Sequence, residues 1–200
     1  MTRASMIHVI DDDDAARDSL VFLLEASDYR VQAYESAVAF IDSSPDTDGS
    51  CIVTDLRMPK MDGIGLLREL RARSNNCPVI VTTGHADIPL AIEAIAIGAF
   101  DFIEKPFDAD VLLAALRSAL DPDGASATAQ TRTEVLDRVA TLSSRERQVF
   151  DRMALGRSNR AIAHELGYTE RVVEVHRANV LTKMQATHLS NLVRMALTLR

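Results

Sequence analysis

The chain has 200 residues, a length that suggests one large domain or two small ones. Hydrophobic residues make up 47% and charged residues 26%, an ordinary globular composition that excludes a disordered or collagen-like chain. No apolar run reaches the roughly 18 residues that a membrane-spanning helix needs, and the N-terminus has no pattern of a secretory signal. The two cysteines are too few for a disulfide framework. We therefore expect a cytoplasmic protein with buried thiols and no membrane partner.

The net charge of −7 conceals two halves of opposite sign. Residues 1–122 contain 21 acidic and 10 basic residues, whereas residues 123–200 contain 8 acidic and 12 basic residues. An acidic half joined to a basic half indicates two domains with different partners. The segment 121–133 between them has no large apolar residue and contains Pro122 and Gly124. It is therefore predicted to be a linker, although its Ala and Gln residues also allow helix.

The first half alternates short strands with helices. Five β-rich runs are predicted as strands: Met6–Ile10, Arg30–Tyr34, Cys51–Thr54, Val79–Thr83 and Phe100–Ile103. Segments with helical periodicity follow them: Ala15–Ala26, Ala37–Asp42, Ile64–Arg73, Pro89–Ile97 and Ala109–Leu120. Five βα units in series predict an α/β domain with a parallel sheet covered on both faces. Right-handed crossovers make this sheet doubly wound.

The second half has no strand-like run and is predicted to be all-α. Its four predicted helices are Ser144–Leu155, Arg160–Leu166, Glu170–Met184 and Leu189–Leu199. Serine and threonine residues stand where helix caps belong, and glycines stand at the helix ends: Ser143 or Ser144, Ser158, Thr169, Gly156 and Gly167. The short turn at Gly167–Tyr168 joins two of these helices into a helix-turn-helix. The apolar stripe of the last helix either belongs to the core or forms a dimer surface.

Polar side chains follow four of the five predicted strands. Asp11–Asp14 follow the first strand, Asp55 the third, Thr83 and Gly84 end the fourth, and Glu104–Pro106 follow the fifth. In doubly wound sheets ligands lie beyond the carboxyl ends of the strands. We therefore expect carboxylates, a hydroxyl and the ammonium of Lys105 to converge at one edge of the sheet.

This combination of groups is suited to phosphoryl transfer. Carboxylates that are packed together repel one another unless a cation joins them, and ligands that offer only oxygen favour Mg²⁺. Asp55 would then be the nucleophile that forms an aspartyl phosphate. Mg²⁺ and Lys105 would neutralise the phosphoryl oxygens, and Thr83 would donate a hydrogen bond to one of them.

Each of these residues also has a purely structural interpretation. Asp11–Asp14 could be a solvated run at a helix N-terminus, where acidic residues are favoured. Thr83 could be a cap or turn residue, and Lys105 a surface lysine. Their joint placement at separate strand ends favours the functional interpretation.

Four motifs of the first half resemble those of a bacterial response-regulator receiver domain: VIDDDD, VTDLRMPKMDG, VTTGHAD and DFIEKPF. The resemblance covers residues 5–120 and implies a five-stranded, flavodoxin-like sheet with the strand order 2-1-3-4-5. It implies that Asp11, Asp12 and Asp55 hold Mg²⁺ together with the backbone carbonyl of Arg57. Asp55 would accept a phosphoryl group from a histidine kinase.

The same resemblance implies which residues would respond to the phosphoryl group. Lys105 would contact the phosphoryl group and would precede a cis peptide bond to Pro106. Phe102 occupies the position of the family's switch aromatic residue and would rotate inward as Thr83 moves. A strand core residue is the structural alternative for Phe102.

The predicted helix Glu170–Met184 has two distinct faces. Val173, Val180 and Met184 share one face and should pack inward. The opposite face carries small and polar residues, which fit the major groove of DNA. On it we expect Arg171, Glu174, Val175 and Ala178 to contact the edges of the bases. Those expected at phosphates are His176, Arg177, Asn179 and Lys183. This distribution of residues around the helix also fits an ordinary amphipathic surface helix. His176 could instead be a buried, hydrogen-bonded histidine.

The segments LSSRERQV, IAHELG and VEVHRANVLTKM resemble the four-helix DNA-binding domain of the LuxR/NarL class over residues 138–198. Val172 departs from that pattern, which usually has Thr, so one backbone contact is in doubt. The two halves together are most similar to FixJ-type regulators. The predicted organisation is a receiver domain at 1–121, a linker at 122–137 and a helix-turn-helix domain at 138–200.

The resemblance implies a phosphorylation-activated transcriptional regulator of a two-component system. Its partners would be a sensor histidine kinase and double-stranded promoter DNA, and it would form a homodimer when phosphorylated. It would not be an enzyme. One alternative is a phosphorylation-independent DNA-binding regulator with a vestigial receiver domain. Another is an aspartyl-phosphate phosphohydrolase, but Leu56 and Arg57 follow Asp55 where such an enzyme would have a DxD pattern.

Overall fold

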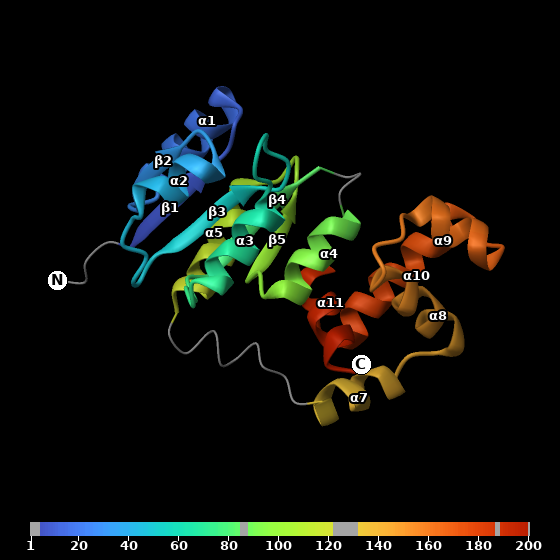
Figure 1. Cartoon of the computed structure of the whole chain (residues 1–200). Helices are drawn as coiled ribbons and strands as arrows, with labels where there is room; N and C mark the ends of the chain where they lie inside the picture. The colour runs from blue at the N-terminus through green and yellow to red at the C-terminus, as the bar shows by residue number, and fades with distance from the viewer. Residues whose placement is uncertain (1–4, 85–87, 122–131, 187–188, 200) are drawn as a thin grey trace. The chain divides into compact units, whose positions relative to one another are not determined.

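The computed structural model describes residues 5–84, 88–121, 132–186 and 189–199. The chain divides into two compact units, Met1–Thr128 and Ala129–Arg200, which are described separately (Figure 1). The first unit contains a sheet with helices, and the second contains helices among its described residues. The predicted division into an α/β part and an all-α part is therefore confirmed.

The first unit is built on a five-stranded sheet. Its strands are β1 (Met6–Ile10), β2 (Arg30–Tyr34), β3 (Cys51–Asp55), β4 (Val79–Thr83) and β5 (Asp101–Glu104). All neighbouring strands are parallel, and the order β2-β1-β3-β4-β5 is the one predicted. Asp55 is the last residue of β3 and pairs with Thr82, whereas the predicted strand ended at Thr54. The predicted nucleophile is therefore fixed by the sheet itself.

Helices cover both faces of this sheet. They are α1 (Asp14–Glu25), α2 (Ala37–Ser43), α3 (Gly63–Ala72), α4 (Ile88–Ile97) and α5 (Ala109–Leu120). Apolar residues of α1 and α5 pack on the face that carries Ile7 and Val9. On the opposite face the ring of Phe40 in α2 meets His8 and Tyr34 edge-on. Successive strand residues point to opposite faces, so the buried strands need apolar residues at nearly every position.

The second unit has its own hydrophobic core. Its helices are α7 (Arg132–Ala140), α8 (Ser144–Met153), α9 (Asn159–Leu166), α10 (Glu170–Met184) and α11 (Leu189–Thr198). Ser143 and Glu146 form a capping box at α8, and the hydroxyls of Ser158 and Thr169 cap α9 and α10. Gly167 ends α9 in the left-handed conformation, with a φ of 69°. The predicted helix-turn-helix is thus formed by α9 and α10.

The linker prediction differs from the structure in one respect. Helix α7 lies partly within the predicted linker 122–137, yet it belongs to the second unit because Val135 and Val139 are buried in that core. Arg132 and Arg138 of α7 donate hydrogen bonds to the carbonyls of Thr198 and Met184. Residues 122–131 lie outside the described residues. On the last helix, Leu192 of the predicted apolar stripe belongs to the core and Leu189 and Ala196 pack against it, as one of the two interpretations of that helix expected.

Candidate functional site

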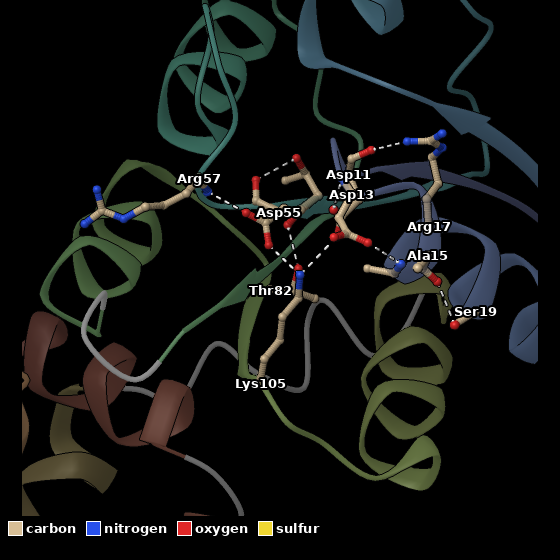
Figure 2. A network of polar contacts seen from close by, with 11 residues as sticks. Asp11, Asp13, Ala15, Arg17, Ser19, Asp55, Arg57, Thr82 and Lys105 are labelled. Carbon is tan, nitrogen blue, oxygen red and sulfur yellow. Dashed lines mark hydrogen bonds and ion pairs between the residues drawn. The ribbon is translucent and has the colours of Figure 1, made fainter.

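The carboxyl ends of β1, β3 and β5 bring three predicted site residues together (Figure 2). The Nζ of Lys105 lies 3.0 Å from Asp11 Oδ2 and 2.5 Å from Asp55 Oδ1. One ammonium group thus joins two carboxylates that would otherwise repel each other. These three residues are 94 and 50 positions apart in the sequence, and the sheet topology alone brings them into contact.

Asp55 is fixed by donors on both of its carboxylate oxygens. Oδ1 accepts from Lys105, and Oδ2 accepts from the backbone N–H of Arg57 at 2.6 Å. Its backbone lies close to the start of α3, because a Cβ built on Gly63 would lie 2.7 Å from the Asp55 carbonyl oxygen. Only glycine fits there without a shift of the chain. The Asp55 side chain keeps 15% exposure, so it is accessible from solvent.

Asp11 is almost fully buried, whereas Asp12 is exposed. Asp11 Oδ1 accepts from the backbone N–H of Asp13 at 3.0 Å, and Oδ2 accepts from Lys105. The Asp13 side chain caps α1 by accepting from the N–H of Ala16 at 2.8 Å. The consecutive aspartates therefore have different roles, since Asp13 caps α1 and Asp11 binds Lys105.

Burial and the neighbouring carboxylates have opposing effects on the pKa of Lys105. Burial of the ammonium lowers the pKa, but the hydrogen bonds and the negative charges of Asp55 and Asp11 outweigh burial. The pKa of Lys105 therefore lies above its ordinary value of 10.5. Lys105 is thus a permanent cation at physiological pH, as the neutralisation of phosphoryl oxygens requires.

The predicted switch residues, Thr83 and Phe102, are both buried. Thr83 and Phe102 are 1% and 6% exposed. The Thr83 hydroxyl contacts the carbonyl of Gly84 at 3.3 Å, and the Thr83 carbonyl accepts from the Lys105 N–H at 2.7 Å. The peptide bond between Lys105 and Pro106 is cis, as expected. Because Phe102 is already buried here, its inward rotation stays a prediction about a change between two states.

The donor set is chemically suited to Mg²⁺. Within the part of the chain that the structure describes, no three His, Cys, Asp or Glu side chains gather closely enough to hold an ion by themselves. Mg²⁺ does not require such a cage, because it keeps several waters and uses only one or two carboxylates. Asp11 and Asp55 already lie on either side of one cationic group. The residues present therefore fit a hydrated ion held by few protein oxygens.

One residue of this network was missed by the sequence reasoning. Arg17 in α1 donates to the backbone carbonyl of Asp11 at 2.7 Å (Figure 2). It also pairs with Asp14 at 2.5 Å. Its spacing of three residues from Asp14 on a helix is a recognisable signal for an ion pair. The contact with the carbonyl of Asp11 has no such signal, because it depends on how α1 returns towards β1.

In the second unit, α10 exposes the face whose residues are predicted to contact the bases of DNA. Val173, Val180 and Met184 are fully buried, as predicted. Four residues predicted at base edges are exposed: Arg171, Glu174, Val175 and Ala178. Val175 and Val172 are among the exposed large hydrophobic side chains of the described chain, at 57% and 40%. Exposed apolar side chains on a polar helix face are suited to contact with thymine methyl groups.

The four residues predicted at phosphates lie in different environments. Asn179 is exposed, and Arg177 and His176 are half-buried. The Nδ1 atom of His176 is buried without a hydrogen-bond partner among the described residues, and its ring lies 5.9 Å from that of Tyr168. His176 is thus partly buried, but its Nδ1 lacks the partner that a buried, hydrogen-bonded histidine would have, and its contact with phosphate stays a prediction.

Lys183 is engaged within the second unit. Its Nζ lies 2.6 Å from Glu146 Oε2 and 3.3 Å from the carbonyl of Thr141. The hydrogen bond from Lys183 and that from the backbone of Ser143 lower the pKa of Glu146 from 4.5 to about 2. A phosphate contact by Lys183 stays a prediction and would have to compete with these partners. Lys183 and Glu146 are 37 positions apart on different helices, so no local sequence pattern predicts their ion pair.

Comparisons with known proteins identify both units. Residues 7–117 match the response regulator receiver domain, and residues 140–196 match the bacterial regulatory proteins of the luxR family. The transcriptional regulatory protein FixJ of Azorhizobium caulinodans is 51% identical over 198 residues, which is 98% of this chain and 94% of that protein. The chain belongs to the FixJ-type response regulators.

Other relatives agree with this assignment. FixJ of Bradyrhizobium diazoefficiens is 46% identical over 98% of this chain and 97% of its own length. A crystal structure of full-length FixJ from B. japonicum covers 99% of this chain and 98% of its own, with 46% identity and a TM-score of 0.58. The structure of FixJ-N covers 60% of this chain and 95% of its own at 44% identity, with a TM-score of 0.57.

This FixJ-type regulator therefore combines a receiver domain with a LuxR-type DNA-binding domain, an organisation consistent with phosphorylation-activated transcription regulation. The relatives named above are transcriptional regulators. Among the described helices, none is both long and apolar enough to cross a membrane.

Proposed function

We propose that this FixJ-type regulator accepts a phosphoryl group on Asp55 from a sensor histidine kinase, and that the modification increases its affinity for promoter DNA. The contact of Lys105 with both Asp55 and Asp11 carries this proposal, because it joins a nucleophile to the cation that neutralises the transferred group. The protein would act in the cytoplasm, where its DNA target lies, and would not turn over a metabolite.

In the transfer step a carboxylate oxygen of Asp55 attacks the phosphorus of the donor. The bond from phosphorus to the donor histidine nitrogen breaks, and its electron pair stays on that nitrogen. Lys105 holds one oxygen of Asp55 and is in place to neutralise the incoming group. Asp11, Asp12, Asp55 and the backbone carbonyl of Arg57 would hold Mg²⁺, which when bound supplies positive charge for the phosphoryl oxygens.

The DNA-binding step would use α10 in the major groove. Arg171, Glu174, Val175 and Ala178 would read base edges from their exposed face. His176, Arg177, Asn179 and Lys183 would contact phosphates, which orient the helix without reading sequence. A homodimer would place two such helices on two half-sites, and phosphorylation would favour that dimer.

Incubation with acetyl phosphate and Mg²⁺ followed by intact mass spectrometry tests the phosphorylation step. The wild-type chain should gain about 80 Da, the mass of one phosphoryl group. Asp55→Asn should gain nothing, because the amide is a poor nucleophile. Asp18→Asn, an exposed aspartate on α1, is the matched control and should be modified like the wild type.

Three results would contradict the proposal. A gain of mass in Asp55→Asn would place the acceptor elsewhere. Equal DNA affinity of the modified and unmodified wild type in a gel-shift titration would favour a regulator with a vestigial receiver domain. Release of phosphate from phosphomonoesters with continued turnover would favour the phosphohydrolase.

A further inference from the structure

Arg17 connects the first helix of the receiver domain to the loop that carries Asp11 and Asp12. Its side chain is only 16% exposed, although its neighbours Asp14, Ala15 and Asp18 on α1 are exposed. The guanidinium divides its donors between two partners, the carbonyl oxygen of Asp11 at 2.7 Å and the carboxylate of Asp14 at 2.5 Å. Figure 2 shows this side chain turned back towards the loop and away from the body of α1.

The hydrogen bond from Arg17 gives the Asp11 carbonyl a partner, so that the backbone and the carboxylate of Asp11 are both held in place. The Asp11 N–H donates to the carbonyl of Tyr34 at 3.3 Å, and both carboxylate oxygens have donors, the Asp13 N–H and Lys105. The Asp11 carbonyl lies just beyond the paired residues of β1, which end at Ile10. Arg17 supplies it with a charge-assisted hydrogen bond, which is stronger than a bond between neutral groups.

We propose that Arg17 is a positioning residue for Mg²⁺. It holds the peptide group between Asp11 and Asp12, and thereby sets how these two carboxylates present themselves to one ion. The inference rests on the proposed function, because it takes the Mg²⁺ site from there. Outer-shell groups of this kind orient the ligands of a metal and commonly affect its affinity 10- to 100-fold.

Replacement of Arg17 would change the affinity for Mg²⁺ in two ways that have opposite signs. Removal of its positive charge makes a cluster of aspartates more negative, which by itself strengthens the binding of a cation. Loss of its hydrogen bond to the Asp11 carbonyl frees the loop, which weakens binding. The direction of the change in affinity therefore distinguishes the two.

Titration calorimetry with MgCl₂ on the full chain measures this direction. Arg17→Gln should raise the dissociation constant for Mg²⁺ by about tenfold. Arg30→Gln is the matched control, because Arg30 is exposed and pairs in the sheet with Met6, at the end of β1 opposite to Asp11. It removes the same charge and should leave the constant unchanged within about twofold, since exposed charges beyond about 10 Å are screened.

A conservative variant distinguishes a positioning role of Arg17 from a role in folding. Arg17→Lys keeps the charge and can donate to Asp11, but one ammonium group lacks the planar fork of the guanidinium. Its Mg²⁺ affinity should lie between those of the wild type and Arg17→Gln. If thermal melting shows that Arg17→Gln is unfolded without Mg²⁺, Arg17→Lys alone decides, and wild-type affinity in that variant would overturn the inference. Unchanged or tighter binding by folded Arg17→Gln would overturn it as well.

Asp11→Asn distinguishes failure of this inference from failure of the proposed site. If Asp11→Asn binds Mg²⁺ as tightly as the wild type, the ion lies elsewhere, and both the site and the role of Arg17 are wrong. If Asp11→Asn binds weakly while Arg17→Gln binds like the wild type, the site stands and only the role of Arg17 is wrong.

Discussion

A Cβ at Gly63 would meet the Asp55 carbonyl oxygen at 2.7 Å and the Leu56 Cα at 3.1 Å, and both are backbone atoms that cannot turn aside. At Gly65, two residues further along α3, the nearest atoms are side-chain atoms of Asp62 and Met61 at 3.2 Å. The two glycines of one helix thus differ in what surrounds them. Gly63 lets the start of α3 lie against the residue that is proposed to react.

Gly63→Ala should therefore lower the free energy of unfolding of the receiver domain by about 1–3 kcal/mol, the usual cost of overpacking. It should also slow modification by acetyl phosphate, because relief of the contact moves the Asp55 backbone. Gly65→Ala is the control and should have a much smaller effect, since the side chains next to it can shift. Urea denaturation and the time course of intact mass measure the two effects. Equal stability of both variants would show that the close approach at Gly63 has no energetic consequence.

Glu146 gives the second unit a dependence on pH. In the folded chain its pKa is about 2, because Lys183 and the backbone of Ser143 stabilise the carboxylate, whereas its ordinary value is 4.5. A group whose pKa falls on folding stabilises the folded state above the unfolded pKa. That contribution should be lost progressively as the pH falls from about 4.5 to about 2.

Glu146→Gln should remove this dependence. In the variant, hydrogen exchange of the amides of α8 and α10 should be faster than in the wild type at neutral pH, and the difference should shrink as the solution is acidified below about pH 4.5. Asp151→Asn breaks an exposed ion pair with Arg147 on α8 and is the control, because exposed pairs contribute little. A difference between Glu146→Gln and wild type that stays constant from pH 7 to pH 2 would contradict the assignment.

At the scale of elements, the sequence predicted the order and type of most of the fold. Strand–helix alternation and cap residues carry strong local signals, and the parallel sheet follows from them. Helix α7 was missed because it begins within the segment 121–133, which has no large apolar residue. Its spacing of Val135 and Val139 was the available signal. The bonds of Lys183 to Glu146 and of Arg17 to Asp11 depend on how helices pack, so no local pattern announces them.

The packing of α7 predicts where the DNA-binding unit begins. Two buried valines and the bond from Arg138 to the Met184 carbonyl tie α7 to the core and to the end of α10. A fragment of residues 132–200 should fold and bind DNA without a phosphoryl donor. A fragment of residues 141–200 should melt at a lower temperature and bind DNA more weakly, because α10 loses a partner at its C-terminal end. Equal melting temperatures of the two fragments would show that α7 is dispensable.

For the whole molecule, phosphorylation of the acidic receiver domain would have to change DNA binding by a second unit of opposite charge. In the proposed mechanism, phosphorylation of Asp55 would change charge and packing near Thr83 and Phe102. Phe102 lies on β5, beside α4. Helix α4 is strongly apolar, and Leu90 and Ile92 on it are half-buried. A surface of α4, β5 and α5 can therefore become a dimer interface. Dimerisation would raise DNA affinity, because the second half-site is then bound intramolecularly.

Light scattering on the full chain, with and without acetyl phosphate and Mg²⁺, measures this step. The wild type should double its mass when modified, and should then bind DNA with two half-sites about 10 base pairs apart more tightly than DNA with one. Leu90→Asp should be modified normally but stay monomeric, because a charge on α4 opposes burial of that surface. Phe22→Asp, on the exposed side of α1, is the matched control and should dimerise like the wild type, since Phe22 is 77% exposed and lies on another helix. If modification leaves both mass and DNA affinity unchanged, dimerisation is not how the receiver domain controls DNA binding. If Phe22→Asp stays monomeric while Leu90→Asp dimerises, the interface lies on α1 and not on α4.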